Sequence, residues 1–218
     1  MISPHSNVPR VRLGPTDAFM CTQLSPDWFE LRRGIATASN FDRIMTLAKR
    51  KYSAAAEGYI DELIAERFVL DPNAMTETPM SAAMRHGVAC EPEARSWYEI
   101  HTGQTAQQVG FCIDAQERFG CSPDALVGEV GVLELKVPQG KTHVGYLRAG
   151  TLPSEYACQV HGHLLVTGRQ WCDFVSYCPG LNPFIVRVTP DDFTAALTVC
   201  LEQFWAQFQE TLAKIGGL

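Results

Sequence analysis

Asp124, Glu134 and Lys136 have the residue types and the spacing needed to cut a phosphodiester with the help of a metal ion. Glu134 and Lys136 lie in an apolar segment bounded by Gly131 and Pro138, which predicts a short buried strand. Because side chains two residues apart share one face of a strand, we expect the carboxylate and the ammonium to lie side by side. A charge held against a core is costly unless it is paired or bound to a metal.

Asp124 precedes this strand by a segment with room for a strand end and a tight turn at a glycine. A hairpin would therefore fold Asp124 back towards Glu134. One or two carboxylates are the usual protein share of a Mg2+ site, so we expect Mg2+ here, with Mn2+ as a substitute and the carbonyl of Leu135 as a further ligand. Lys136 is expected to orient or help deprotonate the attacking water and to stabilise charge on the phosphate. The alternative is an ordinary solvated ion pair.

A possible anion pocket lies nearer the N-terminus. A helix start at Ser25 and a stop at Gly34 predict a short helix, with Arg32 near its end. Ser39 is expected to cap a second helix, because apolar residues recur at helical spacing over 41–48. A helix N-terminus with a serine hydroxyl binds anions, and Arg32 beside it would complete a phosphate pocket. The alternatives are a surface arginine and an ordinary helix cap.

Tyr156, Gln159 and His163 recur at helical spacing in a segment that predicts a helix over 154–166. They share one face of that helix, which we expect to look at the metal site. A hydrogen-bonded bystander is the alternative for His163, because the sequence around it has no cysteine or carboxylate at zinc spacing.

Together these motifs resemble the phage lambda exonuclease and YqaJ group of viral-type recombination nucleases, a branch of the PD-(D/E)XK superfamily. The resemblance covers most of the chain, from about Trp28 to about Phe208. Its motifs are Trp28-x-x-x-Arg32-x-Gly34-x-x-Thr37-Ala38-Ser39, Gly87-x-x-x-Glu91, Asp114, Ser122-Pro123-Asp124, Leu133-Glu134-Leu135-Lys136 and Tyr156-x-x-Gln159. One departure is Ala125, where the family usually has glycine.

The resemblance implies an α/β fold with a restriction-endonuclease-like core, in which a central mixed β-sheet is flanked by helices. It adds Glu91 as a third metal-binding and catalytic carboxylate, and Asp114 as a residue that supports the metal site directly or through a ligand. It also implies a pocket for the 5′ phosphate of the strand being degraded. The expected substrate-binding residues are Arg32, Ser39, Ser122, Tyr156 and Gln159.

The activity that the resemblance implies is Mg2+-dependent digestion of linear double-stranded DNA from the 5′ end, which leaves a 3′ single strand for annealing. It further implies a phage-type single-strand annealing protein as partner and a homotrimer ring around duplex DNA. One alternative is a structure-specific or restriction-type endonuclease on the same fold. A nuclease-like binding module without activity is the other, and the presence of both acids and the lysine disfavours it.

Composition favours one nuclease domain over residues 16–218, preceded by a flexible arm over residues 1–15. The sequence has no apolar run long enough for a signal peptide or a membrane span, so we expect no membrane contact and a cytoplasmic location. Eight scattered cysteines are expected to be small buried side chains. An apolar stripe over 193–208 predicts a long final helix against the core or a subunit contact.

The net charge of −6 argues against a protein that coats nucleic acid. Positive charge can still gather locally, as in Lys49-Arg50-Lys51, which is either a solvated surface or a contact to the DNA backbone.

Overall fold

The computed structural model describes residues 8–68 and 82–215, and the strands of these residues form two five-stranded sheets and one small hairpin. In the first sheet the order is β1 (Arg10–Leu13), β2 (Thr16–Phe19), β7 (Phe111–Ile113), β8 (Phe119–Cys121) and β3 (Ala36–Thr37). In the second sheet it is β12 (Phe184–Val188), β11 (Trp171–Ser176), β10 (Gly131–Lys136), β9 (Ala125–Val127) and β6 (Ala106–Gln107). Each sheet has one parallel pair, β3 with β8 and β10 with β11, among antiparallel pairs. The predicted mixed α/β fold is confirmed.

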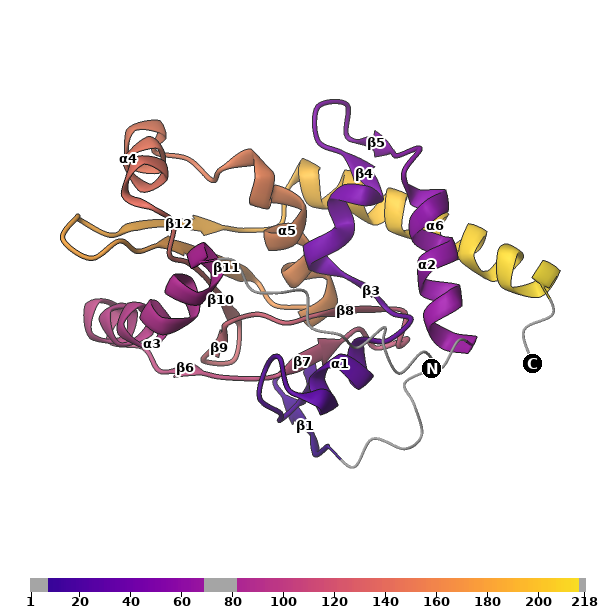
Figure 1. Ribbon diagram of the computed structural model, residues 1–218, viewed down its shortest axis with the longest axis horizontal. Coiled ribbons are helices and arrows are strands. Elements are labelled where there is room, and N and C mark those ends of the chain that lie inside the picture. The colour runs from indigo at the N-terminus through magenta and orange to yellow at the C-terminus, as the bar shows by residue number, and fades with distance from the viewer. Residues whose placement is uncertain (1–7, 69–81, 216–218) are drawn as a thin grey trace.

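Helices surround these sheets (Figure 1). The α-helices are α1 (Pro26–Arg32), α2 (Ala56–Phe68), α3 (Ala82–Thr102), α4 (Gly140–Ala149), α5 (Ala157–Thr167) and α6 (Asp192–Ile215). Two short 3-10 helices are η1 (Ala38–Arg43) and η2 (Ser154–Tyr156), and the hairpin consists of β4 (Met45–Thr46) and β5 (Lys51–Tyr52).

The second sheet is covered on both faces. On one face Leu133 and Leu135 of β10 pack in a cluster with Tyr98 of α3. On the other face Val132 of β10 and Phe174 of β11 belong to the main core, which also includes residues of α5 and α6. Strand β10 is therefore buried on both sides, and any charged side chain on it must find its partners inside the protein.

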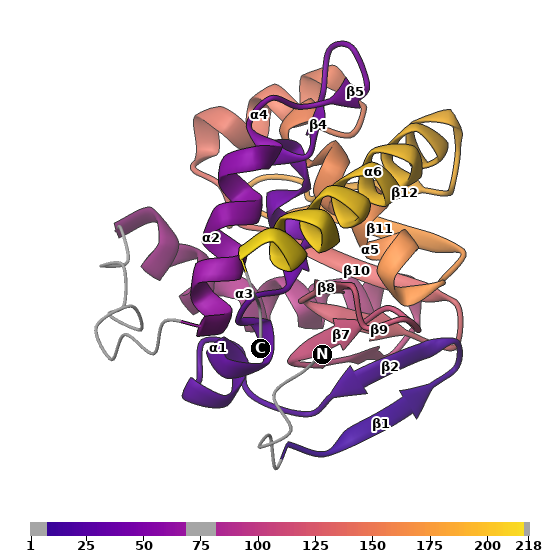
Figure 2. The same cartoon turned by 90° about the vertical axis from the view of Figure 1, so that its right-hand side faces the viewer.

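The apolar stripe predicted over 193–208 lies on α6, and its inner residues are buried in the main core. Helix α2 lies beside α6 in both views (Figures 1 and 2), and the rings of Tyr59 and Phe204 are 5.7 Å apart between the two helices. Asp191 caps α6, since its carboxylate accepts hydrogen bonds from the backbone amides of Phe193 and Thr194 at 2.8 and 3.1 Å.

The predicted helix over 41–48 is wrong. The chain forms η1 there and then turns through the β4–β5 hairpin, with Arg50 in the left-handed backbone region at a φ of 49°. Phe41 and Ile44 are buried as their spacing suggested, but they reach the core from a 3-10 helix and the residue after it. Thr37, not Ser39, occupies the N-terminal cap position of η1.

Pro92 lies inside α3, which begins ten residues earlier at Ala82. One further expectation for the N-terminal half needs correction. The predicted arm over 1–15 is partly ordered, since β1 pairs with β2 at the edge of the first sheet (Figure 2). The first seven residues of that arm lie outside the described residues.

Candidate active site

The two predicted metal-binding acids face each other across the β9–β10 hairpin. Strand β9 pairs with β10 in antiparallel register, with Ala125 opposite Leu133. Continuing that register by one residue places Asp124 opposite Glu134. Two hydrogen bonds agree with this register, because the Asp124 amide donates to the Leu133 carbonyl at 3.1 Å and Asp124 Oδ2 accepts from the Leu135 amide at 2.5 Å. The hairpin predicted from the sequence is therefore present.

Glu134 is held by three side chains. Its Oε1 accepts hydrogen bonds from Lys136 Nζ at 2.5 Å and from Gln159 Nε2 at 2.7 Å. Its Oε2 lies 2.8 Å from Nε2 of His163. The shared face predicted for the helix at 154–166 thus looks at the acid pair, and Tyr156 joins it, with its ring centroid 5.2 Å from Lys136 Nζ.

Asp124 and Glu134 bring two buried carboxylates close to a single ammonium. Burial and the neighbouring Glu134 raise the pKa of Asp124 well above its usual range. Burial would also raise the pKa of Glu134, but the charge of Lys136 and the hydrogen bonds to Glu134 lower it to about 2. Burial opposes the charge of Lys136, yet Glu134 and Asp124 raise the pKa of the ammonium above its usual value. One ammonium does not compensate both acids.

These residues fit a hard divalent cation. Carboxylate oxygens are the ligands that Mg2+ prefers, and a cation between Asp124 and Glu134 would relieve the repulsion that raises the pKa of Asp124. Within residues 8–68 and 82–215, no three His, Cys, Asp or Glu side chains are placed to enclose an ion. The protein therefore offers a pair of carboxylates, and water and phosphate oxygens would supply the other positions, as is common for Mg2+.

Glu91 lies close to the pair without joining it. Its charge contributes to the raised pKa of Asp124. However, Glu91 Oε1 accepts a hydrogen bond from Arg95 one helical turn further along α3. Arg95 occupies only one of the two carboxylate oxygens, so Glu91 stays a candidate third ligand. Glu91 lies in the middle of α3, directly before Pro92.

The residues of the predicted anion pocket come together around Ser122, two residues before Asp124. Arg32 donates to Ser122 Oγ at 3.1 Å and to Thr37 Oγ1 at 3.3 Å. Thr37 Oγ1 in turn lies 3.3 Å from Ser39 Oγ, so the predicted residues Arg32, Ser39 and Ser122 do come together. Trp28 anchors the group, because its indole N–H lies 2.9 Å from Ser122 Oγ and its ring centroid lies 4.1 Å from Arg32 Cζ.

Arg32 is a partly buried cation whose hydrogen bonds go to two neutral hydroxyls. No carboxylate of the described residues lies within ion-pair distance of its guanidinium. Burial lowers the pKa of Arg32, which shows the cost of this arrangement. A bound anion would remove that cost, and a phosphate suits a guanidinium beside hydroxyl groups.

The family is decided by comparison with known domains and structures. Residues 27–170 match the model of the YqaJ-like viral recombinase domain, a range that includes every residue of the acid site and of the anion pocket. The chain belongs to this family. It is a nuclease, and its fold is the PD-(D/E)XK-like fold of the relatives described next.

Solved structures agree with this assignment. The YqaJ-like chain is similar to an alkaline exonuclease (LHK-Exo) from Laribacter hongkongensis, with a TM-score of 0.73 and 34% identity over 88% of this chain and 96% of that one. The structure of LHK-Exo in complex with dAMP gives a TM-score of 0.74 and 35% identity over the same shares. A phage related exonuclease from Haemophilus somnus 129PT, with a TM-score of 0.59 and 8% identity over 84% of this chain and 96% of that one, shows the fold alone. The comparison with curated proteins found no match.

Gln159 lies on the helix face that looks at the acid pair, as predicted. Its amide donates to Glu134, and no hydrogen bond joins it to Arg32 or Ser122 among the described residues. A contact from Gln159 of this YqaJ-like domain to a terminal phosphate stays a prediction. Thr37, which was quoted in the family motif without a role in the pocket, connects Arg32 to Ser39. His163 lies on the predicted face and bonds to Glu134.

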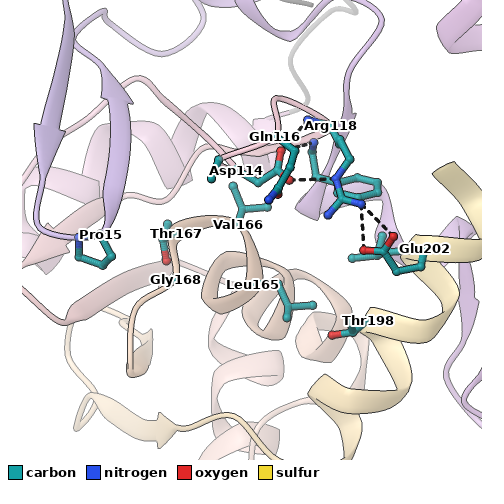
Figure 3. A pocket seen from close by; sticks show the side chains of 13 residues that line it. Pro15, Asp114, Gln116, Arg118, Leu165, Val166, Thr167, Gly168, Thr198 and Glu202 are labelled. Atoms are coloured by element: carbon teal, nitrogen blue, oxygen red, sulfur yellow. Dashed lines mark hydrogen bonds and ion pairs between the residues drawn. The ribbon is translucent and has the colours of Figure 1, made fainter.

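Asp114 does not support the acid pair. Its carboxylate accepts from the backbone amides of Arg118 and Phe119 and from the Arg118 side chain, so it closes the β7–β8 turn. That turn lies at the end of β8 opposite to Ser122. Figure 3 shows Asp114 beside Arg118 and Glu202, where they line a separate hollow of about 210 Å3. The expected role of Asp114 at the metal site is therefore corrected to a role in the turn.

The basic segment, the cysteines and the helices can be compared with the sequence predictions, although their function is not tested. Lys49, Arg50 and Lys51 are exposed around the β4–β5 turn, and a DNA contact there stays a prediction. All eight cysteines are free, and five of them are buried. No helix in the described ranges combines the length and the apolar composition needed to cross a membrane.

Proposed function

We propose that this protein is a Mg2+-dependent exonuclease that digests one strand of linear double-stranded DNA from its 5′ end and leaves a 3′ single strand. The family match and the likeness to LHK-Exo support exonuclease activity on DNA. The metal, the polarity and the duplex substrate are the further steps of the proposal.

The observation that carries the proposal is the link between the two clusters. Ser122 of the anion pocket and Asp124 of the acid pair belong to one segment of three residues. Two residues of extended chain span at most about 7 Å, a distance on the order of one nucleotide along a strand. A terminal phosphate held by Arg32 and Ser122 would therefore place the next phosphodiester at the acid pair. An enzyme that measures its cut from a terminal 5′ phosphate removes nucleotides from that end.

Each group has a role in this chemistry. Asp124 and Glu134 would hold Mg2+, with the Leu135 carbonyl and Glu91 as further candidate ligands, and the bound ion would polarise the phosphate and activate water. Lys136 would orient the attacking water and stabilise the charge that develops on the phosphorus oxygens. Arg32 and Ser122 would hold the terminal phosphate in place, with Ser39 beside them.

LHK-Exo has been crystallised in complex with dAMP, a mononucleotide. A mononucleotide is the product expected from removal of the last nucleotide of a strand, and the same kind of product is proposed here. By the family resemblance we also propose a homotrimer ring around the duplex and a phage-type single-strand annealing protein as partner. A ring would retain DNA despite the net charge of −6, and a measured mass equal to one chain of 24.1 kDa would contradict it.

The test is digestion of end-labelled linear duplex DNA with Mg2+, Mn2+ or EDTA. We expect the 5′ label to be released early as a mononucleotide with Mg2+ or Mn2+, and no release in EDTA, because two buried acids alone offer no Lewis acid. Closed circular duplex of the same sequence is the matched control and should stay intact. Cutting of the circle would support the alternative endonuclease, early release of a 3′ label would reverse the polarity, and full activity in EDTA would remove the metal from the proposal.

The anion pocket makes a prediction of its own. Arg32→Gln should weaken the use of 5′-phosphorylated ends about 10- to 100-fold, because a hydrogen bond to a charged group contributes about 1.5 to 3 kcal/mol. The wild-type preference for a 5′ phosphate over a 5′ hydroxyl should disappear with it. Initial rates on the two kinds of end, measured over a range of DNA concentrations, check this.

Arg33→Gln is the matched control. Arg33 follows Arg32 directly but donates to Glu30 at 2.8 Å, away from the pocket. It should keep the preference for a phosphorylated end. If Arg32→Gln kept that preference as well, the pocket would not be the phosphate site.

A further inference from the structure

The side chain of His163 is completely enclosed and has one hydrogen-bond partner. It is 1% exposed, and its Nε2 lies 2.8 Å from Glu134 Oε2. Its other ring nitrogen, Nδ1, is buried without a hydrogen-bond partner among the described residues. A carboxylate only accepts hydrogen bonds, so Nε2 carries the proton.

The backbone that carries the His163 ring is tightly packed. Helix α5 approaches η1 so closely that a Cβ at Gly162 would lie 2.7 Å from the Phe41 ring. Gly162 therefore allows the backbone next to His163 to pack tightly. At the following turn Thr167 Oγ1 donates to the His163 carbonyl at 2.6 Å, which ties the end of the helix to the same residue.

The hydrogen bonds of Glu134 leave one acceptor position open. A carboxylate has about four lone-pair positions. Lys136 and Gln159 both bond to Oε1, and His163 alone bonds to Oε2. The remaining lone pair is therefore on the oxygen that His163 holds. Without His163, Oε2 would have no hydrogen-bond partner in the described part of the chain, and only the two bonds to Oε1 would resist rotation of the carboxylate about its last bond.

We infer that His163 is a positioning residue, which fixes the Glu134 carboxylate so that Oε2 keeps one lone pair for the cation that Asp124 and Glu134 bind together. The inference rests on the proposed metal-dependent function and deepens it. A side chain that hydrogen-bonds to a metal-binding residue orients that residue. Removal of such a side chain typically lowers metal affinity or activity about 10- to 100-fold.

The test measures Mn2+ binding in the absence of DNA, by electron paramagnetic resonance of the free ion. His163→Leu should lower Mn2+ affinity about 10- to 100-fold relative to wild type. His163→Gln should bind Mn2+ nearly as wild type does, because its amide nitrogen can occupy the place of Nε2 and donate to Oε2. In His163→Asn the side chain is one bond shorter, so its amide lies near the place of Nδ1 and does not reach Oε2. This variant should therefore lose Mn2+ affinity as His163→Leu does.

His161→Asn is the control on the same helix. His161 is also buried, but its Nδ1 lies 2.7 Å from Thr194 Oγ1 and it does not contact Glu134. The Mn2+ affinity of His161→Asn should equal that of wild type. Circular dichroism and melting curves without metal show which variants fold. If His163→Leu does not fold, the comparison of His163→Gln with His163→Asn still tests the inference.

Wild-type affinity in His163→Leu or in His163→Asn would overturn the inference, and so would loss of affinity in His163→Gln equal to the loss in His163→Asn. Failure of the proposed function would look different. In that case wild type itself would bind no Mn2+ or would cut DNA in EDTA, before any variant is compared.

Discussion

Asp124→Asn should lower the rate of DNA cleavage about 10³-fold or more, while the protein stays folded. A bound metal contributes several kcal/mol of transition-state stabilisation, and about 4 kcal/mol corresponds to a factor of 10³ in rate. Asparagine is a far weaker ligand than a carboxylate but keeps the shape of the side chain. Its carbonyl oxygen can still accept the hydrogen bond from the Leu135 amide.

The same variant should melt at an equal or higher temperature than wild type in EDTA. Burial and Glu134 raise the pKa of Asp124, which means that the charged form destabilises the folded protein at neutral pH. The neutral asparagine removes that penalty. Mg2+ should raise the melting temperature of wild type and not that of the variant, because a ligand stabilises only the state that binds it.

Single-turnover cleavage and thermal melting with and without Mg2+ measure both effects. Asp61→Asn, which removes an exposed carboxylate on α2, is the control and should change neither. Cleavage by Asp124→Asn at the wild-type rate would refute the acid pair as the metal site.

Lys136→Met should lower the single-turnover rate about 10²- to 10³-fold without lowering metal affinity. This is the usual effect of removing one group that stabilises charge in a transition state. Methionine is of similar length and can remain against the Tyr156 ring, which lies 5.2 Å from the Lys136 ammonium. Loss of the ammonium leaves Glu134 with less compensating charge, so a cation between the acids should bind at least as well as in wild type.

The measurement is the cleavage rate at saturating DNA over a range of Mg2+ concentrations, with Mn2+ affinity determined in parallel. Lys214→Met removes an exposed ammonium that pairs with Glu210 near the end of α6, and it should cleave as wild type does. If high Mg2+ restored full activity to Lys136→Met, Lys136 would serve metal binding and not the chemical step.

Much of the acid site could be predicted from local sequence. The alternation around Glu134 and Lys136 and a turn at a glycine determine a hairpin, because side chains two residues apart on a strand share a face. The structure places both side chains and Asp124 as this periodicity predicts. The anion pocket was less directly predictable from local sequence. Arg32, Ser39 and Ser122 meet as expected, although Ser39 reaches the pocket from within a 3-10 helix.

Errors arose where a local pattern competed with contacts from distant parts of the chain. The helical spacing over 41–48 correctly predicted which residues are buried, but not the type of helix. Phe41 and Ala38 pack closely against Gly162 of α5, and the chain forms a 3-10 helix there. Pro92 lacks an amide proton, which disfavours a helix interior, yet α3 continues through it while Ala94 and Tyr98 pack on the second sheet. Tertiary packing overrides weak local preferences of this kind.

The sequence by itself determined which residues carry the chemistry and which strand presents them, because strand periodicity and turn residues act over a few neighbours. Only the tertiary structure decided that Asp114 closes a distant turn, that Gln159 and His163 both hold Glu134, and that Arg95 holds Glu91. The direction of a side chain depends on the elements that pack around it. Those elements come from segments far apart in the chain, and their pairing is set by the burial of the whole core.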